Sequence, residues 1–451
     1  MAESERDAML SQTQAPPHGF MAILRQLGPG LIIAASIVGS GELIVTTSLG
    51  AKVGFTLLWF IILGCLLKVL VQIEFGRYAL AHRETTLQAL DKLPGPRLKV
   101  GWLIYLWLFM YVATFCQVAG MIGALADAFR FAGATWNSHA ISLLIALSCS
   151  LLLIIGKYRM VERTSTTMVA AFTIFTIFAV GGLYWTDYPI TMQDIMSGLS
   201  FQLPQDGKFT TAFAAFGIIG VGASELIFYP YWCLEKGYGR SVGANDGSPE
   251  WADRARGWMR VLEADAWVSM LVYTGATIAF YLLGAAVLHG KSVQITNAEL
   301  IPSLSHMYLE TFGKAGLWIF LVGAFIVLYS TVFIATASNA RLFADLMAMI
   351  GVIRDRESST YQNVIRLACG LLPVLYFVIL VYIARPLDLV YWGALSQAFM
   401  LPALCVAALY FHHYRMEYAL ATSSFWTAML WIAAILMTCT GFYQAYTTLL
   451  N

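Results

Sequence analysis

The sequence predicts an all-α membrane protein with eleven transmembrane helices, ten of them forming two five-helix units of opposite orientation. Hydrophobic residues make up 59% of the 451 residues and charged residues only 12%, which leaves too few polar side chains to cover a water-soluble globule. Apolar runs close to the roughly 18 to 20 residues that a bilayer crossing requires recur along the chain. A short motif containing a glutamate also occurs twice.

The apolar runs define the expected spans in order. They cover residues 27–50, 54–76, 101–127, 139–156, 164–185, 211–234, 263–288, 315–340, 364–383, 387–411 and 425–448. The polar residues 1–24 contain Pro16-Pro17 and lack the apolar core of a signal peptide, so we expect a disordered cytoplasmic tail.

Basic residues set the expected orientation. Lys and Arg gather in the connections that share a side with the N-terminus, above all 77–100 and 235–262, both read as solvated linkers. Because Lys and Arg accumulate in cytoplasmic loops, we expect a cytoplasmic N-terminus and an extracytoplasmic C-terminus in the inner or plasma membrane.

The repeated motif lies inside an apolar run each time. Residues 38–44 read VGSGELI and residues 221–227 read VGASELI, so five of the seven positions are identical. Glycine costs roughly 1 kcal/mol relative to alanine inside a helix, so we expect interruptions at Gly39–Gly41 and Gly220–Gly222. Paired interruptions in the two halves of a membrane chain indicate a transporter's substrate site.

The repeat also divides the chain. Residues 25–185 would form one five-span unit and residues 211–411 a second. An odd number of spans inverts the second unit relative to the first, so the two interruptions should meet near the bilayer midplane. The span 425–448 is then an accessory helix.

Further motifs resemble the Nramp family of divalent-metal transporters over about residues 20–410. They are Gly28-Pro29-Gly30, Leu57-Leu58-Trp59, Gln72, Gly156-Lys157, Glu162, Ser330-Thr331, Ser396-Gln397 and Pro402. The resemblance implies the LeuT-type fold, with a site formed by the interrupted first and sixth helices, and transport as the activity.

The sequence departs from that family's pattern at the site itself. The family's Asp-Pro-Gly-Asn motif corresponds to Gly39-Ser40-Gly41-Glu42, and its Met-Pro-His motif to Ser224-Glu225-Leu226. The acidic pair that the family uses for proton movement falls on Thr114 and Gln117, while Gln397 matches a glutamine near the family's metal. The chain therefore resembles a divergent branch that lacks the usual metal ligands.

The remaining polar groups predict an all-oxygen pocket. It would combine side chains with the backbone of the interruptions: Glu42, Glu225, Ser40, Ser224, Gln397, Gly39, Gly41 and Gly222. Oxygen ligands suit Mg²⁺ and Mn²⁺, whereas a thioether selects softer metals. We therefore predict a divalent cation that is harder than the family's usual substrates, held by Glu42, Glu225 and Gln397. Thr114, Gln117 and Lys68 are candidates for a proton or gating path.

Two alternatives stay open at this point. Each glutamate should stand in the first turn of a resuming half-helix, where capping free N–H groups would be a sufficient role. Half-helix N-termini also suit a small organic solute that bears a carboxylate or an amine. Its walls would be aromatic: Phe115, Phe228, Tyr229, Tyr231 and Trp232.

Other classes of function lack their motifs. The sequence has no nucleotide-binding loop and no HExxH motif, so we expect neither an enzyme nor a cofactor. A net charge of +1 gives no indication of nucleic-acid binding. The expected partners are the lipid bilayer, the divalent cation or organic solute, and a coupling proton or sodium ion, with alternating access carried out by a monomer.

Overall fold

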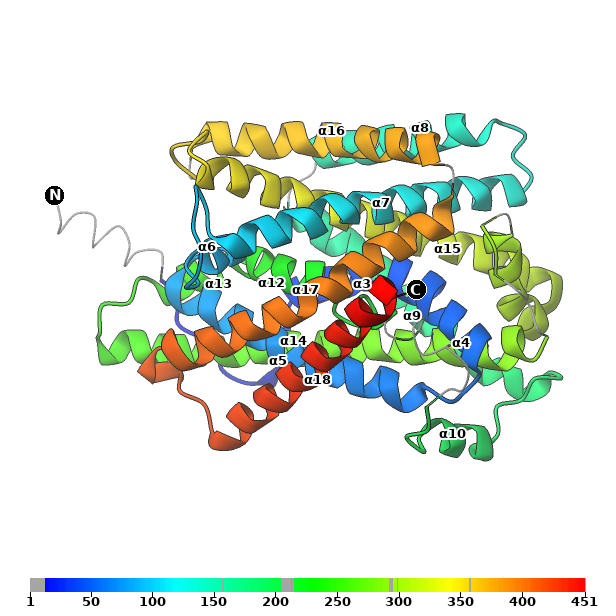
Figure 1. Ribbon diagram of the computed structural model, residues 1–451, viewed down its shortest axis with the longest axis horizontal. Helices are drawn as coiled ribbons and strands as arrows, with labels where there is room; N and C mark the ends of the chain where they lie inside the picture. The colour runs from blue at the N-terminus through cyan, green and yellow to red at the C-terminus, as the bar shows by residue number, and fades with distance from the viewer. Residues whose placement is uncertain are drawn as a thin grey trace.

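A computed structural model describes residues 13–155, 158–203, 212, 215–291, 295–297, 299–356, 358–383 and 385–450. Within these ranges the side chains of residues 40, 158–162, 164–166, 168–169 and 444–450 are not described. The described chain is helical, and in Figure 1 most helices run along the long axis of the molecule. The connections therefore gather at its two ends, with α6 and α13 at one end and α10 at the other.

The helices of the first half follow the expected order. They are α2 (Phe20–Leu24), α3 (Pro29–Ile37), η1 (Val38–Thr46), α4 (Thr47–Val53), α5 (Leu58–His82), α6 (Thr86–Asp91), α7 (Trp102–Phe131), α8 (Ser138–Ile155), α9 (Tyr158–Gly182), η2 (Leu183–Trp185) and α10 (Met192–Gly198). Within the stretch expected to be a disordered tail, α2 forms a helical turn. The backbone N–H of Gln14 also donates to the carbonyl of Ser241.

The second half contains longer helices. They are α12 (Ala223–Lys236), α13 (Tyr238–Val242), α14 (Pro249–Leu283), η3 (Gly284–His289), α15 (Leu300–Met349), α16 (Ser359–Ile383), α17 (Pro386–Tyr414), η4 (Tyr418–Leu420) and α18 (Ser424–Leu450). In the described part of the chain, nine helices are long and apolar enough to cross a membrane. The expected span 164–185 is represented by a shorter apolar stretch, Ala170–Trp185, and the span 211–234 begins outside the described residues.

Several connections are more helical than expected, including 77–100, which contains the end of α5 and all of α6. The interpretation of 235–262 as a solvated linker is wrong, because α13 and the first turns of α14 occupy most of it. The hydroxyl of Ser248 caps α14 by accepting a hydrogen bond from the N–H of Trp251 at 3.1 Å. α15 begins at Leu300 and changes direction at Gly313, whose φ is 58°. An apolar run marks only the membrane-embedded part of a helix, so polar extensions escape it.

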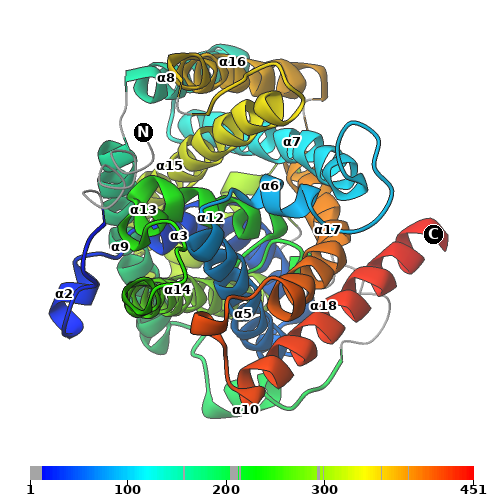
Figure 2. The ribbon, with the colours of Figure 1, turned by 90° about the vertical axis from the view of Figure 1, so that its left-hand side faces the viewer.

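The motif-bearing first span lies at the centre of the bundle. In the apolar window of Pro29–Val53, 94% of the residues are buried, against 33% in α16 and 28% in α18. Seen along the long axis in Figure 2, α8 and α16 lie side by side at one edge, while α18 lies on the outside. Large apolar side chains on these peripheral helices, such as Leu151, Leu367 and Trp431, are exposed, as expected for a surface that faces lipid.

Candidate transport site

Both copies of the repeated motif interrupt an α-helix, but in different ways. In the first copy the chain continues as the π-helical segment η1, which joins α3 to α4. In the second copy, residues 217–222 are non-helical and α12 resumes at Ala223, with Gly222 as its N-cap. π-Helical turns and non-helical segments of this kind are frequent at functional sites.

Because glycine has no side chain, the backbones of the two interruptions can approach each other closely. A Cβ atom on Gly41 would lie 3.0 Å from the carbonyl oxygen of Ile218, closer than such contacts normally are. Gly220 has a φ of 63°, a left-handed conformation that glycine adopts without strain. The glycines of the repeat therefore bring the backbones of the two halves together.

Glu225 belongs to a chain of polar side chains from four helices. Its carboxylate accepts hydrogen bonds from the hydroxyls of Ser36 in α3 (3.0 Å) and Ser224 (2.9 Å). The amide oxygen of Gln397 in α17 accepts from both the N–H and the hydroxyl of Ser224, at 3.0 and 2.8 Å. The amide nitrogen of Gln397 donates to the side-chain oxygen of Gln117 in α7 at 2.7 Å. We call Ser36, Glu225, Ser224, Gln397 and Gln117 the Glu225 group.

The Glu225 group is buried. The relative exposure of its residues ranges from 0% for Gln397 to 8% for Glu225. Glu225 lies in the first turn of α12, as expected, where the positive end of the helix dipole favours a carboxylate. Three of the predicted site residues, Glu225, Ser224 and Gln397, thus come together with Gln117.

Glu42 makes a separate set of contacts. It lies inside η1, so the expectation that it starts a resuming half-helix is wrong. One carboxylate oxygen accepts from the backbone N–H of Gly220 at 3.0 Å, and the other accepts from the hydroxyl of Thr46 at 2.6 Å. Glu42 therefore caps a free N–H of the opposite repeat, with its side chain fully buried.

Lys68 contacts the second interruption from α5. Its ammonium group donates to the carbonyl of Phe216 and, at 2.7 Å, to that of Ile219. No hydrogen bond to Glu42 or Glu225 is seen among the described residues. Thr114, the third gating candidate, donates at 2.7 Å to the carbonyl of Tyr111 in its own helix. Of the three candidates, Gln117 alone joins the Glu225 group.

The remaining predicted positions line the same region. Gly39 packs against α15, where a Cβ would lie 2.6 Å from that of Thr331. The side chain of Ser40 lies outside the described part of the structure. A Cβ on Gly222 would lie 2.5 Å from oxygens of both Gln397 and Glu225. Among the residues described, no three His, Cys, Asp or Glu side chains gather as a metal centre.

The tyrosine and tryptophan side chains of α12 form hydrogen bonds with other helices. The Tyr229 hydroxyl donates to the carboxylate of Asp265, and Trp232 donates to the hydroxyl of Ser338. Tyr231 donates to the carboxylate of Asp345. These partners position the rings as packing elements, which argues against aromatic walls for an organic solute.

Sequence reasoning missed Ser36, Thr46 and the Gly220 N–H. The first two lie on the turns that flank Gly39–Gly41, so their proximity to the motif was the available signal. Their partners come from distant segments, and no local pattern identifies those.

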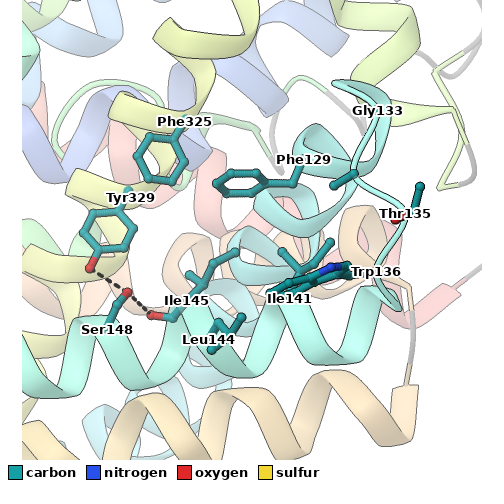
Figure 3. Close-up of a pocket in the computed structure, with 11 residues that line it drawn as sticks. Phe129, Gly133, Thr135, Trp136, Ile141, Leu144, Ile145, Ser148, Phe325 and Tyr329 are labelled. Carbon is teal, nitrogen blue, oxygen red and sulfur yellow. Dashed lines mark hydrogen bonds between the residues drawn. The ribbon is translucent and has the colours of Figure 1, made fainter.

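A pocket separate from the Glu225 group opens between α7, α8 and α15 (Figure 3). It has a volume of about 500 Å³ and an apolar, aromatic lining that includes Phe129, Trp136 and Phe325. Its main polar feature is a contact of 2.9 Å between the hydroxyls of Ser148 and Tyr329. A lining of this kind does not suit an inorganic cation.

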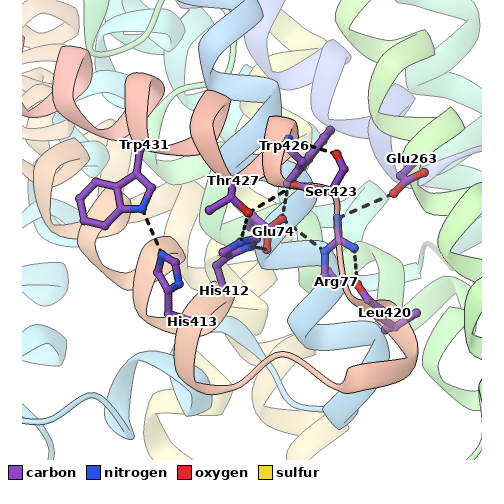
Figure 4. A network of polar contacts seen from close by, with 10 residues as sticks. All are labelled: Glu74, Arg77, Glu263, His412, His413, Leu420, Ser423, Trp426, Thr427 and Trp431. Atoms are coloured by element: carbon purple, nitrogen blue, oxygen red, sulfur yellow. Dashed lines mark hydrogen bonds and ion pairs between the residues drawn. The ribbon is translucent and has the colours of Figure 1, made fainter.

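A second polar cluster joins α5, α17 and α18 (Figure 4). The carboxylate of Glu74 accepts from the indole N–H of Trp426 at 2.6 Å and lies 3.3 Å from both Arg77 and His412. Arg77 also donates to the carbonyl of Leu420 at 3.0 Å. These contacts attach the peripheral α18 to the core of the bundle.

Solved structures with a similar fold are transporters. A variant of the Eremococcus coleocola manganese transporter superposes with a TM-score of 0.69 at 17% identity, over 95% of this chain and 88% of that one. Mhp1, a nucleobase-cation-symport-1 family transporter, superposes with a TM-score of 0.56 at 14% identity, over 93% of each chain. At these identities the likeness establishes the fold, which is the LeuT type.

Sequence relatives agree with the fold. An uncharacterized protein of Pasteurella multocida is 27% identical over 78% of this chain and 77% of its own length. The divalent metal cation transporter MntH of Mycobacterium tuberculosis is 23% identical over 66% of this chain and 64% of its own length. The family model described as natural resistance-associated macrophage protein-like matches residues 30–447. This multi-pass membrane protein therefore belongs to the Nramp family.

Proposed function

We propose that the protein is a secondary transporter that moves a hard divalent cation, Mg²⁺ or Mn²⁺, across the inner or plasma membrane by alternating access. The observation that carries the proposal is the Glu225 group, in which a buried carboxylate, two hydroxyls and two amide oxygens come from four helices. Membership of a family whose relatives include divalent metal cation transporters supports the same class of substrate.

The chemistry of the Glu225 group fits such an ion. Hydroxyls that donate to Glu225 in the described state can rotate and offer lone pairs to a cation. Mg²⁺ keeps several of its waters and needs only one or two carboxylates, so Glu225 supplies sufficient charge. Gln117 holds the amide of Gln397 so that its oxygen faces Ser224.

Glu42 and Glu225 have different roles in this proposal. Both carboxylate oxygens of Glu42 accept hydrogen bonds, from the Gly220 N–H and from the Thr46 hydroxyl. Glu42 therefore adds negative charge near the site without ligating the ion. Glu225 accepts hydrogen bonds from the hydroxyls of Ser36 and Ser224, and a cation can replace those bonds. Alternating access would move α3 and α12, which contribute Ser36 and Glu225, relative to each other.

Isothermal titration tests the proposal directly. The purified protein should bind Mg²⁺ or Mn²⁺, and Glu225→Gln should abolish binding because the amide removes the charge and keeps the shape. Ser36→Ala and Ser224→Ala should weaken binding, whereas Glu250→Gln, at an exposed position in α14, should not.

Uptake into proteoliposomes completes the test. Ion entry should depend on Glu225 and show the same ion preference as binding. Absence of binding and uptake for every divalent ion would refute the proposal and redirect the search to small organic solutes.

A further inference from the structure

Lys68 places a positive charge at the middle of a membrane span. It is the eleventh residue of the 25-residue helix α5, and its side chain has 0% exposure. Burying an unpaired ammonium group at this depth would cost a large amount of free energy, so we expect Lys68 to be paired.

Those contacts are backbone carbonyls and an aromatic face. The ammonium donates to the carbonyls of Phe216 and Ile219 and lies 4.4 Å from the centroid of the Phe216 ring. The Phe216 carbonyl borders the non-helical residues 217–222, and the Ile219 carbonyl lies within them. The interruption of the helix therefore creates the acceptors that Lys68 uses.

A negative charge contacts the same peptide unit from its N–H side. Glu42 accepts from the N–H of Gly220, the residue that follows Ile219. The peptide unit between Ile219 and Gly220 thus has an ammonium on its carbonyl oxygen and a carboxylate on its N–H. This arrangement balances the charges of Lys68 and Glu42 and leaves Glu225 for the transported ion.

Carbonyl oxygens freed by an interrupted transporter helix are ligands for sodium, and rings of carbonyls bind potassium in channels. A lysine ammonium is a compact cation of comparable charge. We propose that Lys68 is a resident cation, whose ammonium takes the place of an inorganic monovalent ion on the carbonyls of Phe216 and Ile219. The transporter therefore needs neither Na⁺ nor K⁺ at this position.

Removing the ammonium should create a monovalent-cation site. Lys68→Ala keeps the carbonyls, the Phe216 ring and Glu42 while opening space beside them. Lys68→Met removes the same charge but fills that space with an apolar chain. The two variants therefore separate cation binding from the simple loss of a hydrogen bond.

The experiment measures thermal unfolding of the purified protein in chloride salts of Na⁺, K⁺, methylammonium or choline at constant ionic strength. We expect Lys68→Ala to unfold several degrees below wild type in choline and to recover saturably with one of the smaller cations. Lys68→Met should not recover. Wild type and Lys99→Ala, at an exposed position, should respond to none of the salts specifically. Adding Glu42→Gln to Lys68→Ala should weaken the recovery at least tenfold in concentration.

Several results would overturn the inference. They are equal recovery of the alanine and methionine variants, no difference among salts for Lys68→Ala, or a specific requirement of wild type for Na⁺ or K⁺. The wild-type measurement decides alone if neither Lys68 variant can be obtained folded. Divalent-ion binding is not used here, so failure of the proposed transport function and failure of the resident-cation inference remain distinguishable.

Discussion

The carboxylate of Glu42, in the first copy of the repeated motif, accepts a hydrogen bond of 3.0 Å from the backbone N–H of Gly220, next to the second copy. Both groups are buried. The two interruptions are therefore joined by a bond from a side chain of one repeat to the backbone of the other.

Replacing Glu42 by glutamine should destabilise the protein without abolishing divalent-ion binding. A glutamine offers one acceptor oxygen where Glu42 serves both Thr46 and Gly220. A buried donor left unpaired costs about 1–3 kcal/mol, which thermal unfolding in detergent would detect. Loss of ion binding at unchanged stability would instead assign Glu42 to the ion.

Gln397→Leu should weaken divalent-ion binding more than Gln117→Leu. Gln397 contacts Ser224 directly, whereas Gln117 is placed to act through the amide nitrogen of Gln397. We expect a loss of about tenfold for Gln397→Leu, equivalent to roughly 1.4 kcal/mol, and a smaller loss for Gln117→Leu. Titration of both variants with the same ion gives the order, and the reverse order would contradict this arrangement.

Asp265→Asn should loosen the start of α3. The buried Asp265 carboxylate accepts from the N–H groups of Gly28 and Gly30 at 2.8 and 2.6 Å and from the Tyr229 hydroxyl at 3.1 Å. An asparagine would direct an NH₂ group at one of these donors, at a cost of about 1–3 kcal/mol in unfolding free energy. Tyr229→Phe removes one bond only and is the milder control. Equal effects of the two substitutions would argue against capping.

The attachment of α18 to the core should depend on the hydrogen bond between Glu74 and Trp426. A double-mutant cycle with Glu74→Gln and Trp426→Phe should give a coupling energy of at least about 0.5 kcal/mol, because the indole donates to the carboxylate at 2.6 Å. Thermal unfolding of the four proteins supplies the energies. Strict additivity would mean that the bond contributes nothing to the attachment of α18.

The orientation predicted from basic residues can be measured with reporter fusions. A C-terminal alkaline phosphatase, which is active only outside the cytoplasm, should be active, and a C-terminal green fluorescent protein should be dark. An N-terminal fluorescent fusion should be bright. The reverse pattern would invert the assignment of the two ends of the bundle.

The fold was more predictable than the contacts of the site. Apolar length and the two VG motifs are local properties of the sequence, and they predicted the helical architecture and both interruptions. The form of each interruption was not predictable, because glycine permits a π-helical turn as readily as an open segment.

The hydrogen-bond partners of the two glutamates were also not predictable. Glu42 and Glu225 occupy equivalent positions in the repeat, yet one contacts the Gly220 backbone and the other contacts Ser36 and Ser224. The two halves differ in sequence around the motif, so the position four residues after the glutamate is Thr46 in one copy and Tyr229 in the other. The local sequence says that a buried carboxylate needs donors, but not which distant segment supplies them.

The bonds across the interruptions have a consequence for biosynthesis. Lys68 and Glu42 emerge from the ribosome and enter the membrane well before residues 216–220 are made. Their partners in the second repeat are therefore absent while the first spans insert, so both groups must be hydrated, neutralised by proton transfer or held by the insertion machinery during that interval. Arrival of the second repeat satisfies both at once, so completion of the site and completion of the fold are a single late event in the maturation of the chain.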